Sequence, residues 1–156
     1  MLSQPADMVP GLPNCGIVAA ATFLNVPYRL IWDLYRIRYK MGPRWRGVTL
    51  ASNYPDLLEA CGVPIFRYEA RREYGQKVNV RNFAKKYARP GVTYMLFVGG
   101  HFLTVRDGWA SDQHACAPID VHPAARKLVR SFFVRKGQHG AAPRTFENSA
   151  MRYAAK

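Results

Sequence analysis

Apolar residues recur at helical spacing through the first third of the chain. Between residues 15 and 24 they return every three or four positions, which predicts a helix that begins at about Cys15. Pro27 should end or bend this helix, because proline removes a backbone donor and clashes with the preceding turn. The same spacing predicts further helices over 28–39, 55–61 and 80–88.

From residue 92 the pattern changes to short runs of β-branched and aromatic residues. Strands are expected over 63–68, 92–98, 101–105, 109–112, 119–122 and 128–134. Asp107-Gly108 is typical of a tight hairpin turn. This order of elements predicts an α+β fold in which N-terminal helices pack on a C-terminal antiparallel β-sheet.

The length of 156 residues suits one domain, which we assign to residues 1–136. Residues 137–156 are expected to form a basic, weakly ordered tail. The N-terminus lacks the basic start of a signal peptide, and the longest apolar stretch is too short to span a membrane. We therefore expect a soluble protein of a reducing compartment that is not secreted by a signal peptide.

Three cysteines, Cys15, Cys61 and Cys116, are widely spaced and odd in number. This pattern does not favour a disulfide framework, and without a C-x-x-C pair it does not favour a zinc site either. We expect no metal and no cofactor. Cys61 and Cys116 are interpreted as small buried residues.

The formal net charge of +13 is concentrated toward the C-terminus. It amounts to +2 over residues 1–60, +5 over 61–112 and +6 over 113–156. Such a surface suits a nucleic acid or another polyanion, although it also fits a basic surface kept for solubility. The basic groups, two of them interleaved with aromatic residues, are Arg44-Trp45-Arg46; Arg67, Tyr68, Arg71, Arg72 and Tyr74; and Arg126, Lys127, Arg130, Arg135 and Lys136.

Cys15 stands where a proline-containing loop enters an apolar helix. The free N–H groups and positive end of a helix N-terminus favour a thiolate there. Gly16 leaves the sulfur uncrowded on one side. A buried core cysteine is the alternative interpretation of this position.

A second candidate segment runs from Gly99 to Asp112. Gly99-Gly100 before His101 would let a substrate backbone approach closely. A turn centred between residues 106 and 107 would make His101 and Asp112 directly opposed across the hairpin, as a histidine and its orienting carboxylate require. His114, two residues past Asp112, is an alternative candidate for the third residue of the site.

The other candidates near this segment have structural interpretations. Asp107 is assigned to the turn, because Asp-Gly is what a tight turn uses. His122 and His139 have no partner in the pattern and are expected at the surface.

The order of these motifs along the chain resembles that of the papain-like cysteine peptidases, especially their small bacterial and viral members and the C39-like group. The matching motifs are Asn14-Cys15-Gly16 before an Ala-rich helix, Val26-Pro27-Tyr28, Arg46-Gly47-Val48-Thr49-Leu50, Ala60-Cys61-Gly62, Gly100-His101, Asp107-Gly108 and Asp112. The resemblance implies a Cys15–His101–Asp112 catalytic triad, a peptide or isopeptide substrate, and a cytoplasmic or virion-associated protein.

One departure concerns the oxyanion hole. Papain-like enzymes commonly place a glutamine about six residues before the cysteine, where this chain has Val9. Asn14 and Gln4 are the available amides, and the Cys15 backbone N–H is a further donor. Loss of one such donor costs a large share of the rate.

Two alternatives to a peptidase remain open. The first is a catalytically weak or inactive papain-like fold that serves as a basic structural or nucleic-acid-associated protein, for example in a virus particle. The second is a cell-wall amidase or endopeptidase, which also pairs an early cysteine with a Gly-His strand.

Overall fold

A computed structural model describes residues 2–136 and 138 of the chain, so the predicted tail lies outside the described residues except for Gln138. Its centre is a six-stranded antiparallel sheet with the order β1-β6-β2-β3-β4-β5. The strands are β1 (Ile65–Glu69), β2 (Tyr94–Phe97), β3 (Phe102–Arg106), β4 (Trp109–Ser111), β5 (Cys116–Pro118) and β6 (Ser131–Arg135). The fold is therefore α+β, as the sequence predicts.

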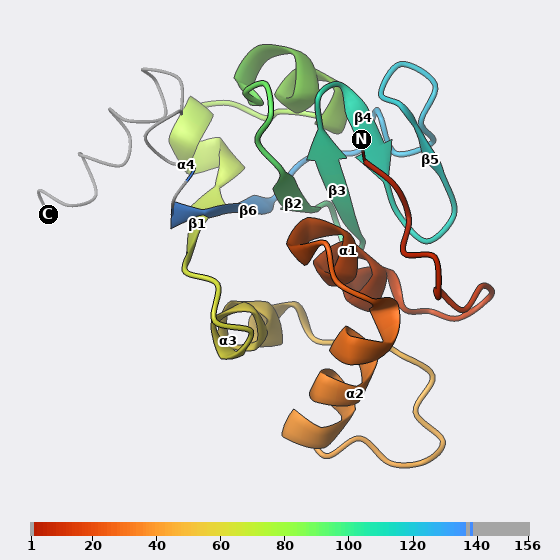
Figure 1. The fold of residues 1–156 in the computed structure, drawn as a ribbon. Coiled ribbons are helices and arrows are strands. Elements are labelled where there is room, and N and C mark those ends of the chain that lie inside the picture. The colour runs from red at the N-terminus through yellow and green to blue at the C-terminus, as the bar shows by residue number, and fades with distance from the viewer. Residues whose placement is uncertain (1, 137, 139–156) are drawn as a thin grey trace, which may run out of the picture.

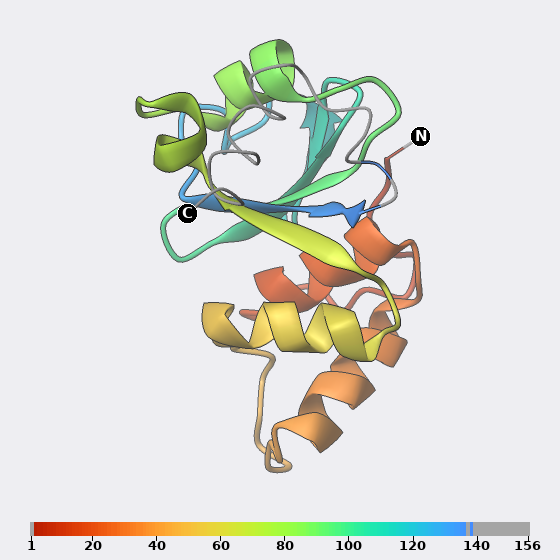
Figure 2. The ribbon, with the colours of Figure 1, turned by 90° about the vertical axis from the view of Figure 1, so that its left-hand side faces the viewer.

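Helices cover both faces of this sheet. They are α1 (Cys15–Leu24), α2 (Tyr28–Arg38), the 3₁₀ turn η1 (Ala51–Asn53), α3 (Tyr54–Ala60), α4 (Ala70–Tyr74), α5 (Val80–Asn82) and the π-helical turn η2 (Phe83–Tyr87). Figure 2 shows the red-to-yellow helices α1, α2 and α3 on one side of the sheet and the green helices on the other. The second helical layer was not expected from the sequence.

The alternation of side chains along the strands divides the core between these two layers. On β6, Phe132 packs with the layer that contains α5 and η2, while its neighbour Phe133 packs with α1, α2 and α3. Both side chains are almost fully buried, as successive residues of a central strand must be when both faces are covered. The sheet thus separates two cores.

α1 is the central helix of the first layer. It packs against β3 and β2, and eight of its ten residues are buried. Figure 1 shows it lying between the sheet and α2. Asn25, in the left-handed conformation, ends the helix two residues before Pro27.

Several expected elements differ in detail. The helix expected over 80–88 is divided between α5 and η2, and α4 was not predicted. The strand expected at 119–122 is replaced by β5, three to four residues earlier. These short elements depend on tertiary contacts, because isolated helices of a few residues are marginal in water.

Candidate active site

Cys15 is the first residue of α1, as the apolar spacing predicts. The thiol is partly buried, and the backbone N–H groups of Phe102 and Gly16 face its sulfur. Because Phe102 opens β3, the start of this strand and the start of α1 meet at the thiol. Thr104 holds the two elements together, since its hydroxyl donates to the carbonyl of Ala19 at 3.0 Å.

His101 contacts both other candidate residues. Its Nε2 lies 2.8 Å from Oδ2 of Asp112, and its side chain also hydrogen-bonds the thiol of Cys15. With Nε2 used by the carboxylate, Nδ1 is the nitrogen available to the thiol. The structure therefore brings together three residues that are up to 97 positions apart in the chain.

Asp112 is held on both carboxylate oxygens. Oδ2 meets His101, and Oδ1 accepts the backbone N–H groups of His114 at 2.8 Å and Ala115 at 2.9 Å. Only 3% of the residue is exposed. These bonds fix the carboxylate plane toward the imidazole.

The hairpin register that was expected for this pair is wrong. Asp107 and Gly108, with φ of 49° and 76°, are the two central residues of the turn, which moves its centre one residue along the chain. Continued past its last pair, the observed register would place Asp112 opposite Leu103. A shift of two positions preserves the face because side chains alternate with a period of two, so His101 and Asp112 meet as diagonal neighbours.

The pKa shifts of Cys15, His101 and Asp112 all favour the charged form of the group. Burial raises the pKa of the Cys15 thiol, but the hydrogen bonds from His101 and the N–H of Phe102 outweigh it and lower the pKa overall. The Asp112 hydrogen bond, followed by that of Cys15, raises the pKa of His101 to about 9. Burial opposes ionisation of Asp112, yet its hydrogen bonds lower its pKa to about 2. Each shift therefore favours the charged form of its group: thiolate at Cys15, imidazolium at His101 and carboxylate at Asp112.

His122 is the residue of this site that sequence reasoning missed. It was expected at the surface, but its side chain is fully buried, and Nε2 lies 3.9 Å from Oδ1 of Asp112. Nδ1 accepts the N–H of Ala124 at 3.0 Å, which leaves Nε2 as the protonated nitrogen, 3.3 Å from the carbonyl of Ala115. The loop that carries β5 brings His122 here, and no local sequence pattern indicates that.

The two amides considered for an oxyanion hole have structural roles. Asn14 is fully buried, and its Nδ2 donates to the Tyr28 hydroxyl at 2.7 Å and to the Val9 carbonyl at 3.2 Å. Both of its amide protons are thus engaged, which corrects the expectation for Asn14. Gln4 donates to the backbone carbonyl of Asp112 at 2.7 Å and supports that loop.

The remaining candidates surround this site without completing it. The His114 ring stacks on that of His101 with centroids 6.4 Å apart. The Asp107 carboxylate accepts the N–H of Gly91 and stays in the turn, as expected. Cys61 and Cys116 are free and only half-buried. His139 lies outside the described residues.

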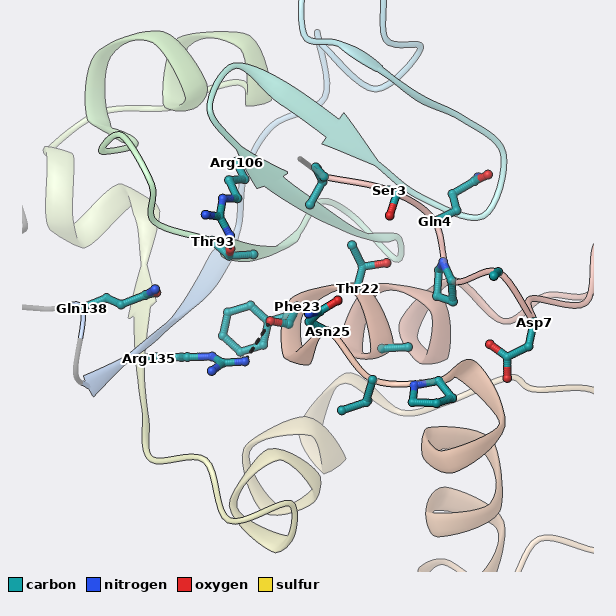
Figure 3. Close-up of a pocket in the computed structure, with 16 residues that line it drawn as sticks. Ser3, Gln4, Asp7, Thr22, Phe23, Asn25, Thr93, Arg106, Arg135 and Gln138 are labelled. Carbon is teal, nitrogen blue, oxygen red and sulfur yellow. Dashed lines mark hydrogen bonds between the residues drawn. The ribbon is translucent and has the colours of Figure 1, made fainter.

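A cavity of about 830 Å³ lies at the other end of α1. Figure 3 shows Arg106 and Thr93 on one side of it and Arg135 beside Phe23 on another. Arg135 donates to the carbonyls of Phe23 and Leu24, so it caps the helix C-terminus. None of the three candidate catalytic residues lines this cavity, which the length of α1 separates from Cys15 by about 15 Å.

No protein-family model, curated protein or solved structure matches this chain. Over residues 2–136 and 138, no helix combines the length and apolar character needed to cross a membrane. Within the same residues, no three histidine, cysteine, aspartate or glutamate side chains are grouped to hold a metal ion.

Proposed function

We propose that this protein is a thiol-dependent hydrolase that cleaves a peptide, isopeptide or related amide bond through an acyl-enzyme. The observation that carries the proposal is the position of His101 between Cys15 and Asp112. A nucleophile, a base and a group that orients the base are the parts that this chemistry needs.

In the proposed reaction, the Cys15 thiolate attacks the substrate carbonyl carbon. The His101 imidazolium then gives its proton to the leaving amine as the C–N bond breaks, which leaves a thioester on Cys15. His101, now neutral, takes a proton from water, and the hydroxide attacks the thioester. The acid product leaves, and the thiolate–imidazolium pair is restored.

The oxyanion of each tetrahedral intermediate needs a donor. With Asn14 engaged elsewhere, the backbone N–H of Cys15 is the donor that we propose, because the first N–H groups of a helix have no acceptor within it. The positive end of α1 adds to this stabilisation.

We extend the proposal to a papain-like arrangement of the chain. The support is the order of the parts: a nucleophile on an N-terminal helix, then a histidine at the start of a strand, and then a carboxylate after the next strand of an antiparallel sheet. The inactive structural protein and the cell-wall amidase remain as outcomes of the experiment below.

The first prediction is that Cys15 is alkylated by iodoacetamide at about pH 6 at least tenfold faster than an ordinary thiol, since an unperturbed thiol is almost entirely protonated there. Mass spectrometry of the modified peptides measures this rate site by site. Cys61 is the internal control, because burial raises its pKa. Equal reactivity of Cys15 and Cys61 would show that the wrong cysteine has been named.

Turnover is tested with a mixed peptide and isopeptide library and, separately, with peptidoglycan. Cys15→Ala should abolish hydrolysis and His101→Ala should nearly do so, whereas Asp112→Ala should be milder because it only positions the imidazole. Cys61→Ala and Cys116→Ala should keep full activity, with circular dichroism as the folding control. A reactive Cys15 without turnover on any of these substrates would favour the inactive structural protein, and cleavage of peptidoglycan alone would favour the amidase.

A further inference from the structure

Ten basic residues gather on the side of the sheet away from Cys15. Residues 70–89 and 122–130 contain all ten and a single acidic residue, Glu73, which is buried. We call this surface the basic face; its members are Arg71, Arg72, Lys77, Arg81, Lys85, Lys86, Arg89, Arg126, Lys127 and Arg130. Nine of the ten are exposed, and Arg89 is half-buried.

Backbone hydrogen bonds hold the two segments side by side. The N–H groups of Val80 and Arg81 donate to the carbonyls of Lys127 and Ala125, each at 2.9 Å. Further along, Val129 donates to Val78 at 2.8 Å, and Ala70 donates to the carbonyl of Arg130 at 3.0 Å. Figure 1 shows α4 and the green helices grouped beyond the sheet from α1 and α2. Charges about 50 positions apart in the chain therefore share one surface.

Among the described residues, exposed ion pairs to Asp120 involve two members of the basic face. Asp120 pairs with Arg81 at 3.0 Å and with Lys85 at 2.7 Å. Both pairs are well exposed, and such pairs are weak enough for a phosphate to compete with them.

The aromatic residues of this region point into the core. The Tyr74 and Tyr87 rings stack on each other at 3.7 Å, and Tyr68, which is 7% exposed, stacks on Phe132. The aromatic residues expected to interleave with the cations therefore contribute little to this surface, whose exposed side chains are mainly the cations. A surface of this kind contacts phosphates and offers no platform for unstacked bases.

The C-terminal basic residues that were expected to bind polyanions together do not all lie on the basic face. Arg126, Lys127 and Arg130 belong to the basic face, whereas Arg135 caps α1. The ammonium group of Lys136 lies over the ring of Phe66.

We propose that the basic face binds the phosphate backbone of double-stranded nucleic acid without reading its sequence. A bilayer is the less suitable polyanion, because membrane-binding surfaces insert apolar side chains. Within residues 70–89 and 122–130, the exposed large apolar residue is Leu128, with Val121 at the margin. The proposal is independent of the hydrolase, because it uses the opposite side of the sheet.

The test uses the full chain, a fluorescent duplex of about 20 base pairs, a single strand of the same length, and anisotropy between about 50 and 200 mM salt. We expect binding to the duplex at least as tight as to the single strand, little change with sequence, and a steep loss of affinity with salt. The patch variant Lys77→Gln/Lys127→Gln/Arg130→Gln should bind at least about tenfold more weakly at low salt. The slope of log K against log salt should fall by about 2 to 3, at about 0.9 per lost phosphate contact.

The matched control is Arg36→Gln/Lys40→Gln/Arg44→Gln, which removes the same charge from exposed positions on α2 and the loop after it. It should change affinity by less than about twofold. Equal losses of affinity in both variants would mean that binding depends on net charge and not on the basic face, and this result would overturn the proposal. The proposal would also be overturned if the protein failed to bind the duplex, preferred the single strand, or bound only to vesicles that contain an anionic lipid. Alkylation of Cys15 in the patch variant should be unchanged, so failure of this proposal leaves the hydrolase untouched.

Discussion

His122 supports Asp112 through the backbone of Ala115. The N–H of Ala115 donates to Oδ1 of Asp112, and its carbonyl accepts from Nε2 of His122. A buried imidazole with both nitrogens engaged is rigid, and groups that orient an active side chain are held in this way. We therefore interpret His122 as a positioning residue that acts through Asp112 on His101.

Two substitutions separate this role from a general effect on folding. His122→Asn keeps an acceptor near the position of Nδ1 for Ala124, but it loses the donor to Ala115. His122→Gln keeps a donor near the position of Nε2. Because a less well-held Asp112 raises the pKa of His101 less, His122→Asn should move the alkaline transition of Cys15 alkylation from about pH 9 to lower pH.

In His122→Gln that transition should stay near its original pH, even though the loss of the Ala124 hydrogen bond lowers the melting temperature. The measurement is the rate of alkylation of Cys15 between about pH 6 and pH 10, with thermal unfolding recorded in parallel. Identical pH profiles for the two variants would restrict His122 to folding.

At the scale of elements, the approach of α1 to α3 depends on Gly16. A side chain on this residue would overlap the hydroxyl of Tyr54 and would lie 2.6 Å from the hydroxyl of Thr49. Tyr54 is fully buried and hydrogen-bonded to Thr49 at 2.8 Å, so its ring cannot move aside easily. Glycine therefore lets the first turn of α1, with the thiol, sit close to the segment that leads into α3.

Gly16→Ala should lower the free energy of unfolding by about 1 to 3 kcal/mol, because overpacking exceeds the gain of about 1 kcal/mol in helix propensity. It should also slow the alkylation of Cys15 by displacing the helix start. Urea denaturation measures the first effect. The double variant Gly16→Ala/Tyr54→Phe should recover part of the stability, because the nearest obstructing atom has been removed. A more stable single variant would contradict this packing.

At the scale of the whole molecule, β6 joins the two cores. Phe132→Ala and Phe133→Ala empty opposite layers, yet each should cost about 3 to 5 kcal/mol, the usual range for a buried phenylalanine. Because the layers share the sheet, each variant should unfold in one transition. Coincident denaturation curves from far-UV circular dichroism and tryptophan fluorescence test this, since Trp32 and Trp45 report on the α1–α3 layer. Separate transitions would mean that the layers fold independently.

The two proposed activities also divide along this sheet. Cys15 belongs to the layer of α1, α2 and α3, while the basic face is built on the layer of α4, α5 and η2. The net charge of +13 predicts an anionic partner without locating its site. The location follows from the pairing of 122–130 with 70–81, which is a long-range contact.

The local pattern of the sequence determined α1 and its first residue, the order of the other helices and strands apart from α4 and β5, and the turn at Asp107-Gly108. Each of these depends on neighbours a few positions apart, through helical spacing, proline, or the positive φ that the turn requires. The same local information identified Cys15, His101 and Asp112 as candidates. It did so with a hairpin register in error by two positions, an error that leaves side chains on the same face.

Only the tertiary structure decided what surrounds these three residues. The burial of His122, the use of Asn14 and Gln4 as structural donors, and the inward turn of Tyr74 are consequences of packing between distant segments. A buried polar group must find a partner wherever the fold supplies one, and the spacing of residues along the chain does not specify which segment that is.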